Sequence, residues 1–211
     1  MKKLSLTLLA VLCAASLSPA AGRLTFGVKA GMIGANMLTA DTEVQWSAKW
    51  GITGGAFVSF ALSDMFAIQP EVLYSPKGAQ YTVSDGTSTF SLIAVASYID
   101  VPFLLKFFLP TGTSEGVKPT IFAGPYVGFK VGKGKIKYDS VYSGQHQTSE
   151  DSWDAVKNLD FGVVLGAGAE FPLDTMKLTL DVRWGTSLST ISKTEDTKHK
   201  AWTFLLGISF N

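Results

Sequence analysis

Apolar residues recur at every second position through most of this chain, and no other feature constrains its fold as strongly. Near the start, for example, Gly27 and Lys29 separate Phe26, Val28 and Ala30. A strand turns successive side chains to opposite faces, so a period of two predicts β-strands with one apolar and one polar face. Eight segments show the pattern, over residues 24–32, 52–62, 66–77, 98–108, 120–132, 160–171, 177–184 and 202–210. Apolar bands of about 9–11 residues suit tilted strands that cross a bilayer.

The connections between these segments alternate between short and long. Segments two and three are joined around Ser63-Asp64, segments six and seven at residues 172–175, and segments four and five by an intermediate turn at residues 110–118. The other connections are long and polar, at residues 34–49, 78–90, 133–157 and 186–200. Outer-membrane barrels sort their connections in this way, whereas a soluble sandwich has no reason to. The sequence therefore predicts an all-β fold, an eight-stranded antiparallel transmembrane β-barrel with an up-and-down meander.

Charged residues and glycines share one parity of the predicted strands, opposite the apolar parity. An eight-stranded barrel has room inside only for side chains, so small residues beside charges suit its interior. A soluble lipocalin-like barrel obeys the same alternation with its faces reversed, and only the placement of glycines and aromatic residues favours the membrane barrel over it. We predict a polar network in the lumen that is formed by Lys29, Glu71, Asp100, Lys106, Lys130, Asp160, Glu170, Asp181 and Arg183.

This predicted network has two interpretations, a path for protons or ions and a salt-bridged plug. Its acids and bases are nearly equal in number, and buried charges persist only when they are paired, which favours the plug. Glu71 with Lys106, and Asp181 with Arg183, lie in segments where pairing is conceivable.

Aromatic residues of the apolar parity gather near the strand ends, as in the two interfacial girdles of membrane proteins. The residues expected at one rim are Phe60, Phe66, Phe107, Phe171 and Phe210, and those towards the other are Tyr74, Trp184 and Trp202. Outer-membrane lipid is therefore the first expected partner.

The first residues have the pattern of an export signal. Two lysines precede an uncharged apolar run at residues 4–17, and residues 18–20 supply a cleavage site. We predict a cleaved signal peptide at residues 1–21, export to the outer membrane, and a single outer-membrane β-barrel domain at residues 22–211. Lipidation of Cys13 is disfavoured because the residue before it is not small. Cleavage would remove this cysteine, so no disulfide is expected.

Several motifs follow one another along the chain: QPEVLYSPKG at residues 69–78, YIDVPFLLK at 98–106, FAGPYVG at 122–128, DFG at 160–162, and the segment 178–185 before a strand that ends in Phe210-Asn211. Their order resembles the PorT-type outer-membrane β-barrel family of Bacteroidetes, part of the wider porin family. The resemblance covers nearly the whole chain after the signal peptide. It implies an outer-membrane barrel, usually of undefined activity, and the family's namesake takes part in type IX secretion.

Residues suited to catalysis or metal binding are few. His146 and His199 are expected to be isolated in loops, so no metal site is predicted. Glu150 and Asp151, with Asp154, lack calcium-loop spacing and are interpreted as a solvated loop surface. No dinucleotide loop or serine nucleophile elbow occurs, so we predict no enzyme and no cofactor. The formal net charge of +1 gives no broad basic surface for nucleic acid.

Three classes of function remain open. The first is a structural or interaction barrel, in which the predicted loop 133–157 contacts an envelope or extracellular protein through Tyr138, Tyr142 and Trp153, although these aromatic residues equally suit packing over the barrel mouth. The second is a narrow porin for small solutes, and the third is an accessory component of a secretion or assembly machine. A soluble lipocalin-like ligand-binding barrel is the remaining alternative. We expect a monomer.

Overall fold

The computed structural model describes residues 24–39, 46–111, 116–142, 145–193 and 197–210, so the predicted signal peptide lies outside the described residues. The strands are β1 (Leu24–Thr39), β2 (Ser47–Ala61), β3 (Phe66–Ser84), β4 (Ser88–Phe108), β5 (Lys118–Tyr142), β6 (Gln145–Trp153), β7 (Leu159–Leu173), β8 (Met176–Ser187) and β9 (Thr197–Phe210). Within the described ranges, no helix has both the length and the apolar character needed to cross a membrane.

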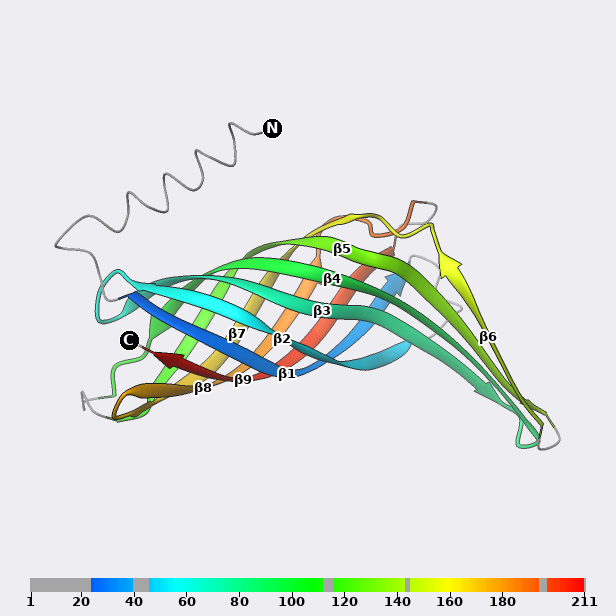
Figure 1. The fold of residues 1–211 in the computed structure, drawn as a ribbon, viewed down its shortest axis with the longest axis horizontal. Helices are drawn as coiled ribbons and strands as arrows, with labels where there is room; N and C mark the ends of the chain where they lie inside the picture. Colours follow the sequence, from blue (N-terminus) through cyan, green and yellow to red (C-terminus); the bar gives the residue numbers. More distant parts are fainter. Residues whose placement is uncertain (1–23, 40–45, 112–115, 143–144, 194–196, 211) are drawn as a thin grey trace.

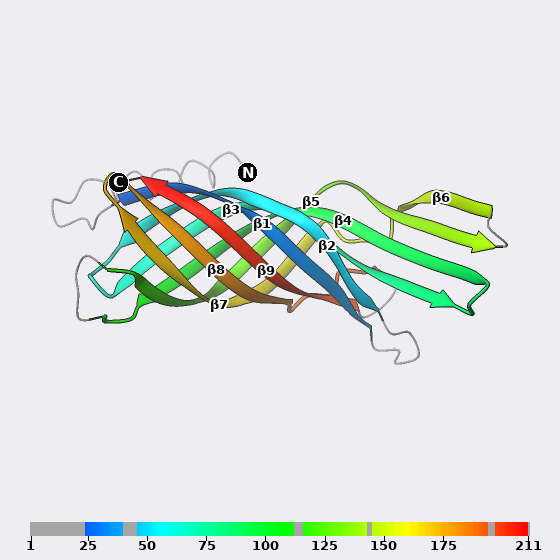
Figure 2. The same ribbon diagram turned by 90° about the horizontal axis from the view of Figure 1, so that it is seen from below.

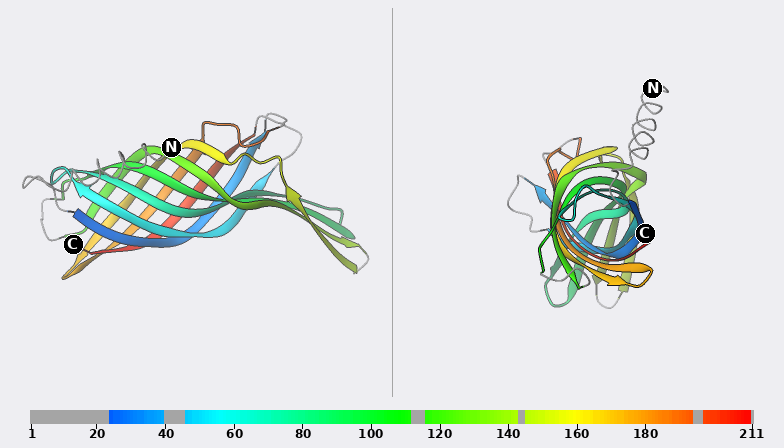
Figure 3. Two further views of the ribbon diagram at one scale, coloured as in Figure 1. Left: turned by 45° about the horizontal axis from the view of Figure 1, so that its top comes forward. Right: turned by 90° about the vertical axis from the view of Figure 1, so that its left-hand side faces the viewer.

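Eight of these strands form a closed antiparallel ring. The sheet order is β4-β3-β2-β1-β9-β8-β7-β5, and the pairing of β4 with β5 closes it. The ring is seen end-on in the right panel of Figure 3. The predicted eight-stranded antiparallel barrel is therefore confirmed. A ninth strand, β6, lies outside the ring and pairs with β5.

Small inward-facing residues make room for long side chains in the lumen. Gly166 of β7 lies in register between Phe122 of β5 and Arg183 of β8. A Cβ atom added to Gly166 would lie 2.4 Å from Cε2 of Phe122. Glycine at this position therefore lets the Phe122 ring and the Arg183 side chain share the narrow interior.

The two faces of the barrel wall differ sharply in polarity. Ile52 on the outer surface is 78% exposed, whereas Lys106 on the inner surface is 1% exposed. Exposed apolar side chains cover the outside along the strands, among them Phe26, Val28, Met32, Val72, Phe103, Leu105, Ile121, Leu165, Leu180, Phe204 and Leu206. A soluble lipocalin-like barrel needs the opposite arrangement, and this alternative is therefore wrong.

The two ends of the barrel also differ. The short β2–β3 and β7–β8 connections lie at the same end as the end of β9 (Figure 1), and we call this the short-turn end. At the opposite end, β3, β4 and β5 continue beyond the ring (Figures 1 and 2). Together with β6 they form a projecting four-stranded sheet, the hairpin extension, made of residues 78–84, 88–95, 134–142 and 145–153.

The extension corrects two predicted connections. Residues 78–90 and 133–157 were expected to be loops, but most of them lie in strands. Their many serine, threonine, glutamine and lysine residues mask the strand signal when apolar alternation is the only criterion. A sheet that projects into water tolerates such residues on a solvated face. The predicted loops 34–49 and 186–200 are also shorter, because β1 ends at Thr39, β2 begins at Ser47 and β9 begins at Thr197.

The strands change register where the extension leaves the barrel. In the β4–β5 pairing, Val95 lies opposite Lys135 and Ser97 opposite Val131, so β5 carries extra residues at this point. Gly132 lies within this irregularity with a φ of 73°, a left-handed conformation that glycine adopts without steric cost. The bulge therefore marks the boundary between barrel wall and extension.

Candidate functional site

The centre of the lumen holds a cluster of four buried charges from β1, β3 and β8. Lys29 Nζ lies 2.5 Å from Asp181 Oδ2 and 3.1 Å from Glu71 Oε1. Arg183 Nη2 donates to Glu71 Oε1 at 2.9 Å and to Asp181 Oδ2 at 2.7 Å. Each cation contacts both carboxylates, and Arg183 reaches Glu71 through both terminal nitrogens. Aromatic rings complete the packing, with Phe57 against Lys29 and Phe122 against Arg183.

A second cluster lies nearer the extension. Lys77 Nζ is 2.9 Å from both Asp100 Oδ1 and Asp160 Oδ2. The Tyr126 hydroxyl donates to Asp160 Oδ2 at 3.0 Å. The Lys77 ammonium also lies 4.4 Å from the centroid of the Tyr126 ring and 5.0 Å from that of Tyr98. One cation thus bridges two carboxylates, and a tyrosine hydroxyl donates a hydrogen bond to one of them.

A third pair lies nearest the short-turn end, where Lys106 Nζ is 2.6 Å from Glu170 Oε1. The sequence suggested Glu71 as the partner of Lys106, and this pairing was wrong, since Glu71 is held by Lys29 and Arg183. The error has a simple cause. Strand tilt and register decide which inward side chains share a layer, and neither is visible in one sequence.

The clusters together fill the lumen with side chains held in ion pairs. Their charged members come from β1, β3, β4, β7 and β8, and Tyr126 of β5 joins them. The large side chains of Tyr98 and Leu104 are also fully buried. Lys130 stands apart from the ion pairs that the described residues form. Its Nζ donates to the carbonyl of Val156 at 3.3 Å, close to the extension.

The two histidines are not the isolated loop residues that the sequence suggested. His146 lies in β6, where it is exposed, and His199 lies in β9, where it is buried with its ring 6.1 Å from that of Tyr98. The His199 ring nitrogens have no hydrogen-bond partner among the described residues. The ring lines a cavity of about 50 Å³ between the central cluster and the second cluster, a space that suits a few water molecules. No group of three or more metal-ligating side chains is assembled by the part of the chain that the structure describes.

The predicted girdle residues occupy both ends of the outer surface. Phe66 and Phe210 at the short-turn end, and Tyr74 and Trp202 towards the other, are exposed. Phe60, Phe107, Phe171 and Trp184 are half-buried. The rings of Phe66 and Phe107 lie 5.1 Å apart. Sequence reasoning missed Trp50, which is exposed and stacks on Phe204.

The hairpin extension has an apolar face that continues the inner wall of the barrel. The apolar residues lie on β3, β4 and β5 and are Ala79, Tyr81, Val83, Phe90, Leu92, Ala94, Ile136, Tyr138 and Tyr142, with Ser140 among them. On β6 the same face carries the polar residues Gln145, Gln147, Ser149 and Asp151. Near the barrel, Met37 and Trp153 pack on it, and Trp46 meets Tyr81 edge-on. At the far end Phe90 remains 42% exposed and Tyr142 71% exposed.

The opposite face of the extension, the polar face, is bound together by side-chain hydrogen bonds and ion pairs. The Thr148 hydroxyl donates to Asp139 Oδ1 at 2.7 Å, and Lys137 Nζ lies 3.0 Å from Asp139 Oδ2. Lys135 Nζ lies 2.6 Å from Glu150 Oε1. Glu150 of the predicted acidic run is thus a member of a solvated pair.

The three residues that were predicted to contact a partner from a loop have different surroundings in the structure. Trp153 is half-buried and packs over the mouth, against Ala96, Tyr98 and Val156. Tyr138 is half-buried on the apolar face, and Tyr142 is exposed near its tip.

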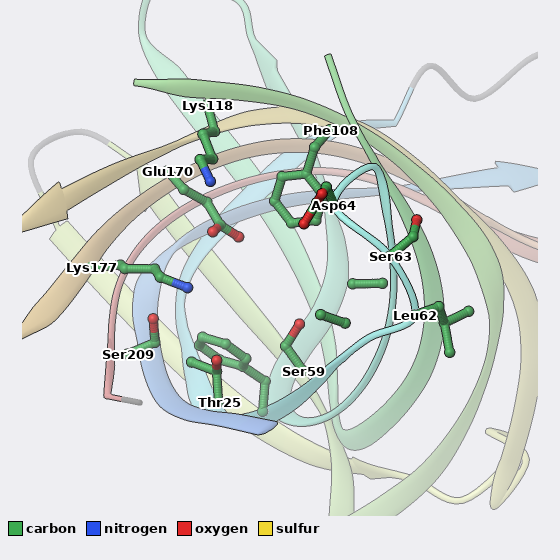
Figure 4. A pocket seen from close by; sticks show the side chains of 13 residues that line it. Thr25, Ser59, Leu62, Ser63, Asp64, Phe108, Lys118, Glu170, Lys177 and Ser209 are labelled. Atoms are coloured by element: carbon green, nitrogen blue, oxygen red, sulfur yellow. The ribbon is translucent and has the colours of Figure 1, made fainter. Parts of the chain in front are cut away.

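A larger cavity, of about 280 Å³, opens at the short-turn end and is drawn in Figure 4. Lys118, Glu170 and Lys177 point into it from β5, β7 and β8, and Asp64 lies on the other side in the β2–β3 connection. We call this cavity the vestibule. The Lys106–Glu170 pair separates it from the central cluster.

Comparison with known sequences gives one match to a family. The sequence profile of the family described as "Outer membrane protein beta-barrel domain" matches residues 14–193, which is most of the chain. No curated protein sequence matches this chain.

Solved structures with a similar course of the chain include Ail, the attachment invasion locus protein of Yersinia pestis, in complex with the heparin analogue sucrose octasulfate. It is 12% identical, with 89% of this chain and 99% of that chain covered and a TM-score of 0.41. Neisserial surface protein A is 12% identical over 88% of this chain and 96% of that one, with a TM-score of 0.43. OprG of Pseudomonas aeruginosa is 10% identical over 88% and 94%, with a TM-score of 0.46. Similarity this low does not extend the binding properties of these proteins to this chain.

Proposed function

The chain belongs to the family of outer membrane protein beta-barrel domains, and from this premise we propose that it is a closed outer-membrane barrel that holds a rigid contact surface outside the cell. In such barrels the short turns face the periplasm and the longer connections face outwards. The hairpin extension would then be extracellular and the vestibule periplasmic. The proposed role is contact with another protein and not catalysis.

The filled lumen supports a closed barrel. Removing an ion from water is expensive, and the lumen charges are retained as hydrogen-bonded groups, such as Arg183 between Glu71 and Asp181. A permeating solute would have to break these contacts. The narrow porin is therefore the weaker alternative, and single-channel recording in planar bilayers tests it. We expect no discrete conductance from the purified barrel, and a reproducible unitary current would reinstate the pore.

The exposed end of the apolar face is the observation that carries the contact role. In water, apolar side chains gathered on one face of a sheet mark a binding surface more often than a solvated one. Phe90 and Tyr142 offer the rigid aromatic area that dominates protein interfaces, and Ser140 offers a neutral polar group between them. Phe90, Ser140 and Tyr142 line a pocket near the tip of the extension, and the one carboxylate in the lining of this pocket is Asp85, in the turn between β3 and β4. A partner with a largely uncharged, apolar surface fits the part of this face that β3, β4 and β5 form.

Photo-cross-linking from neighbouring positions tests the contact role. A photoreactive phenylalanine analogue at Phe90 points from the apolar face, and the same analogue at Ser91 points from the polar face of the same strand. In intact cells we expect a discrete protein adduct from Phe90 and from Tyr142, and none from Ser91. Adducts of equal yield from both faces, or from neither, would contradict the proposal.

The identity of the partner is a finer question. The order of motifs that resembles the PorT-type family favours a component of an envelope machine, such as a secretion complex. The cross-linked partner, identified by mass spectrometry, would decide between such a component and an extracellular protein.

A further inference from the structure

An apolar groove of about 470 Å³ crosses the outer surface of the barrel over β7, β8, β9 and β1. These four strands lie side by side (Figure 2). The small side chains of Ala30 and Ala167 leave room for the groove, and larger apolar side chains bound it, among them Leu180, Val182, Phe204 and Leu206. Its volume is within the range of ligand pockets, and its apolar lining suits a hydrocarbon chain.

A band of three tryptophans lies next to this groove, on the side of the extension. Trp184 of β8 lies in register with Trp202 of β9, and Trp202 and Trp50 lie on either side of Gly34 of β1. A Cβ atom on Gly34 would be 2.9 Å from the Trp50 ring, so this ring leans over β1 where no side chain stands in its way. Trp50 also stacks on Phe204 of the groove. Tryptophans near the ends of lipid-facing strands mark the level of the lipid headgroups, so one side of the groove lies at this level.

Two lysines continue the outward row of β9 beyond the tryptophans. Lys198 and Lys200 share the parity of Trp202 and so point outwards, whereas His199 between them is buried. In the part of the chain that the structure describes, neither lysine has an ion-pair partner. The acidic residues at 195–196 lie outside the described ranges. Lysines at the headgroup level direct their ammonium groups towards lipid phosphates, so these two add a cationic end to the groove.

The order of side chains along β9 matches the build of a lipid. Leu206 and Phe204 line the groove, Trp202 follows, and Lys200 and Lys198 come last. From Leu206 to Lys198 the strand extends about 26 Å, at a rise of roughly 3.3 Å per residue. A strand tilt of about 40° reduces this to about 20 Å along the membrane normal, which is about half the thickness of a bilayer with its headgroups. One lipid can therefore reach from the groove to the lysines.

We propose that the groove and the two lysines together bind one lipid with an anionic phosphate headgroup, in the leaflet at the extension end of the barrel. An acyl chain lies in the groove, the tryptophan band packs at the level where chain and headgroup join, and Lys198 and Lys200 contact the phosphate. Lysine binds phosphate as a point charge and needs no fixed hydrogen-bond geometry. This lipid site depends on the lipid-facing wall alone and is independent of the contact role of the extension.

Tryptophan fluorescence of the whole barrel in phosphatidylcholine vesicles tests the lipid site. Part of the lipid is replaced by phosphatidic acid or by phosphatidylcholine with brominated chains, which quench tryptophans that they contact. We expect phosphatidic acid to bind at least roughly fivefold more tightly than phosphatidylcholine. Free glycerol 3-phosphate should not release this quenching. Release by glycerol 3-phosphate would mean that the site takes a free phosphate group and not a lipid, and equal quenching by the two brominated lipids would overturn the proposal.

A charge variant and its matched control test the headgroup contact. Lys198→Gln/Lys200→Gln should weaken the binding of phosphatidic acid by roughly fivefold or more and leave that of phosphatidylcholine unchanged. The control Lys133→Gln/Lys135→Gln makes the same change of net charge around the base of the extension and should leave the affinity within about twofold. Equal weakening by the two variants would show a general attraction to the charged membrane surface and no site.

A second pair of variants tests the groove. Ala167→Phe fills the groove and should weaken the binding of phosphatidic acid about threefold, because the chain loses its packing contacts. Ala123→Phe makes the same change on the outward face of β5, beyond the groove lining, and should have no effect. Folding of every variant is checked by heat-modifiable gel migration. If Ala167→Phe bound phosphatidic acid as tightly as Ala123→Phe does, the groove would not hold the chain.

Discussion

The strand β4 passes through both regions of the molecule, and its two parts are built in opposite ways. Within the barrel its inward side chains include Asp100 and Lys106, and its outward side chains include Phe103 and Leu105. Beyond the bulge, the face that continues the inner wall is apolar and the opposite face is polar. The backbone pairing is continuous, so secondary structure does not dictate polarity. The polarity of each face is dictated by the medium against it, which is lipid outside the barrel wall and water on the polar face of the extension.

The largest expected effect comes from breaking the charge cluster that only the barrel contains. Arg183→Met leaves Glu71 and Asp181 with Lys29 as their one remaining cation in the cluster. We expect the free energy of unfolding to fall by about 3–5 kcal/mol, because an uncompensated buried charge remains. Urea unfolding of the protein in lipid vesicles measures this.

The exposed pair of the extension is the control for that experiment. Lys135→Met removes the partner of Glu150 on the polar face and should cost less than about 1 kcal/mol. Equal losses in the two variants would mean that burial does not distinguish the two regions.

A charge placed on the outer face of each region tests the assignment of lipid and water. Leu206→Arg puts a cation on the apolar outside of the barrel near the middle of β9, and should cost about 2–4 kcal/mol. Thr82→Arg puts the same side chain on the polar face of the extension and should change stability by less than about 0.5 kcal/mol. If Leu206→Arg were tolerated equally well, the outside of the barrel would not face lipid.

A smaller effect is expected from a substitution within the extension. Leu92 is half-buried against Met37, Ala79 and Ala94 on the apolar face. Leu92→Ser should lower the local opening free energy of the extension by about 1 kcal/mol and leave the barrel unchanged. Amide hydrogen exchange resolves the two regions. Faster exchange throughout the ring would show that the extension and the barrel unfold as one unit.

The smallest effect concerns a single carboxyl group on the polar face. The Thr148 hydroxyl, and after it Lys137, hold the pKa of Asp139 below its ordinary value. A lowered folded-state pKa means that this contact stabilises the extension above the unfolded pKa and is lost as the pH falls through the folded value. Thr148→Ala should therefore raise the pKa of Asp139 towards that of a free aspartate. A carbon-13 titration of the carboxyl group measures it, and an unchanged midpoint would assign the shift to Lys137 alone.

The sequence predicted the strands of the barrel more completely than those of the extension. In the barrel, lipid outside and charge inside impose a strict alternation, so strand positions and the inward set from Lys29 to Arg183 are readable. In the extension the same criterion failed at residues 78–90 and 133–157, because Ser, Thr and Lys on a solvated face resemble a loop. An apolar stripe was nevertheless present at Tyr81, Val83, Phe90 and Leu92. These strands are predicted when an apolar stripe at every second position is accepted together with polar residues at the positions between.

The sequence by itself determined that this chain forms a closed, even-numbered antiparallel barrel with an apolar outside, because a period of two leaves no other way to satisfy backbone and side chains in a bilayer. Only the tertiary structure decided which charges meet. Lys106 pairs with Glu170, and Lys77 bridges Asp100 and Asp160, because strand tilt and register bring distant residues into one layer. It likewise decided that His199 is buried and that Lys118 and Lys177 share a cavity. Periodicity assigns a face to each residue, and the closing of the ring assigns its neighbours.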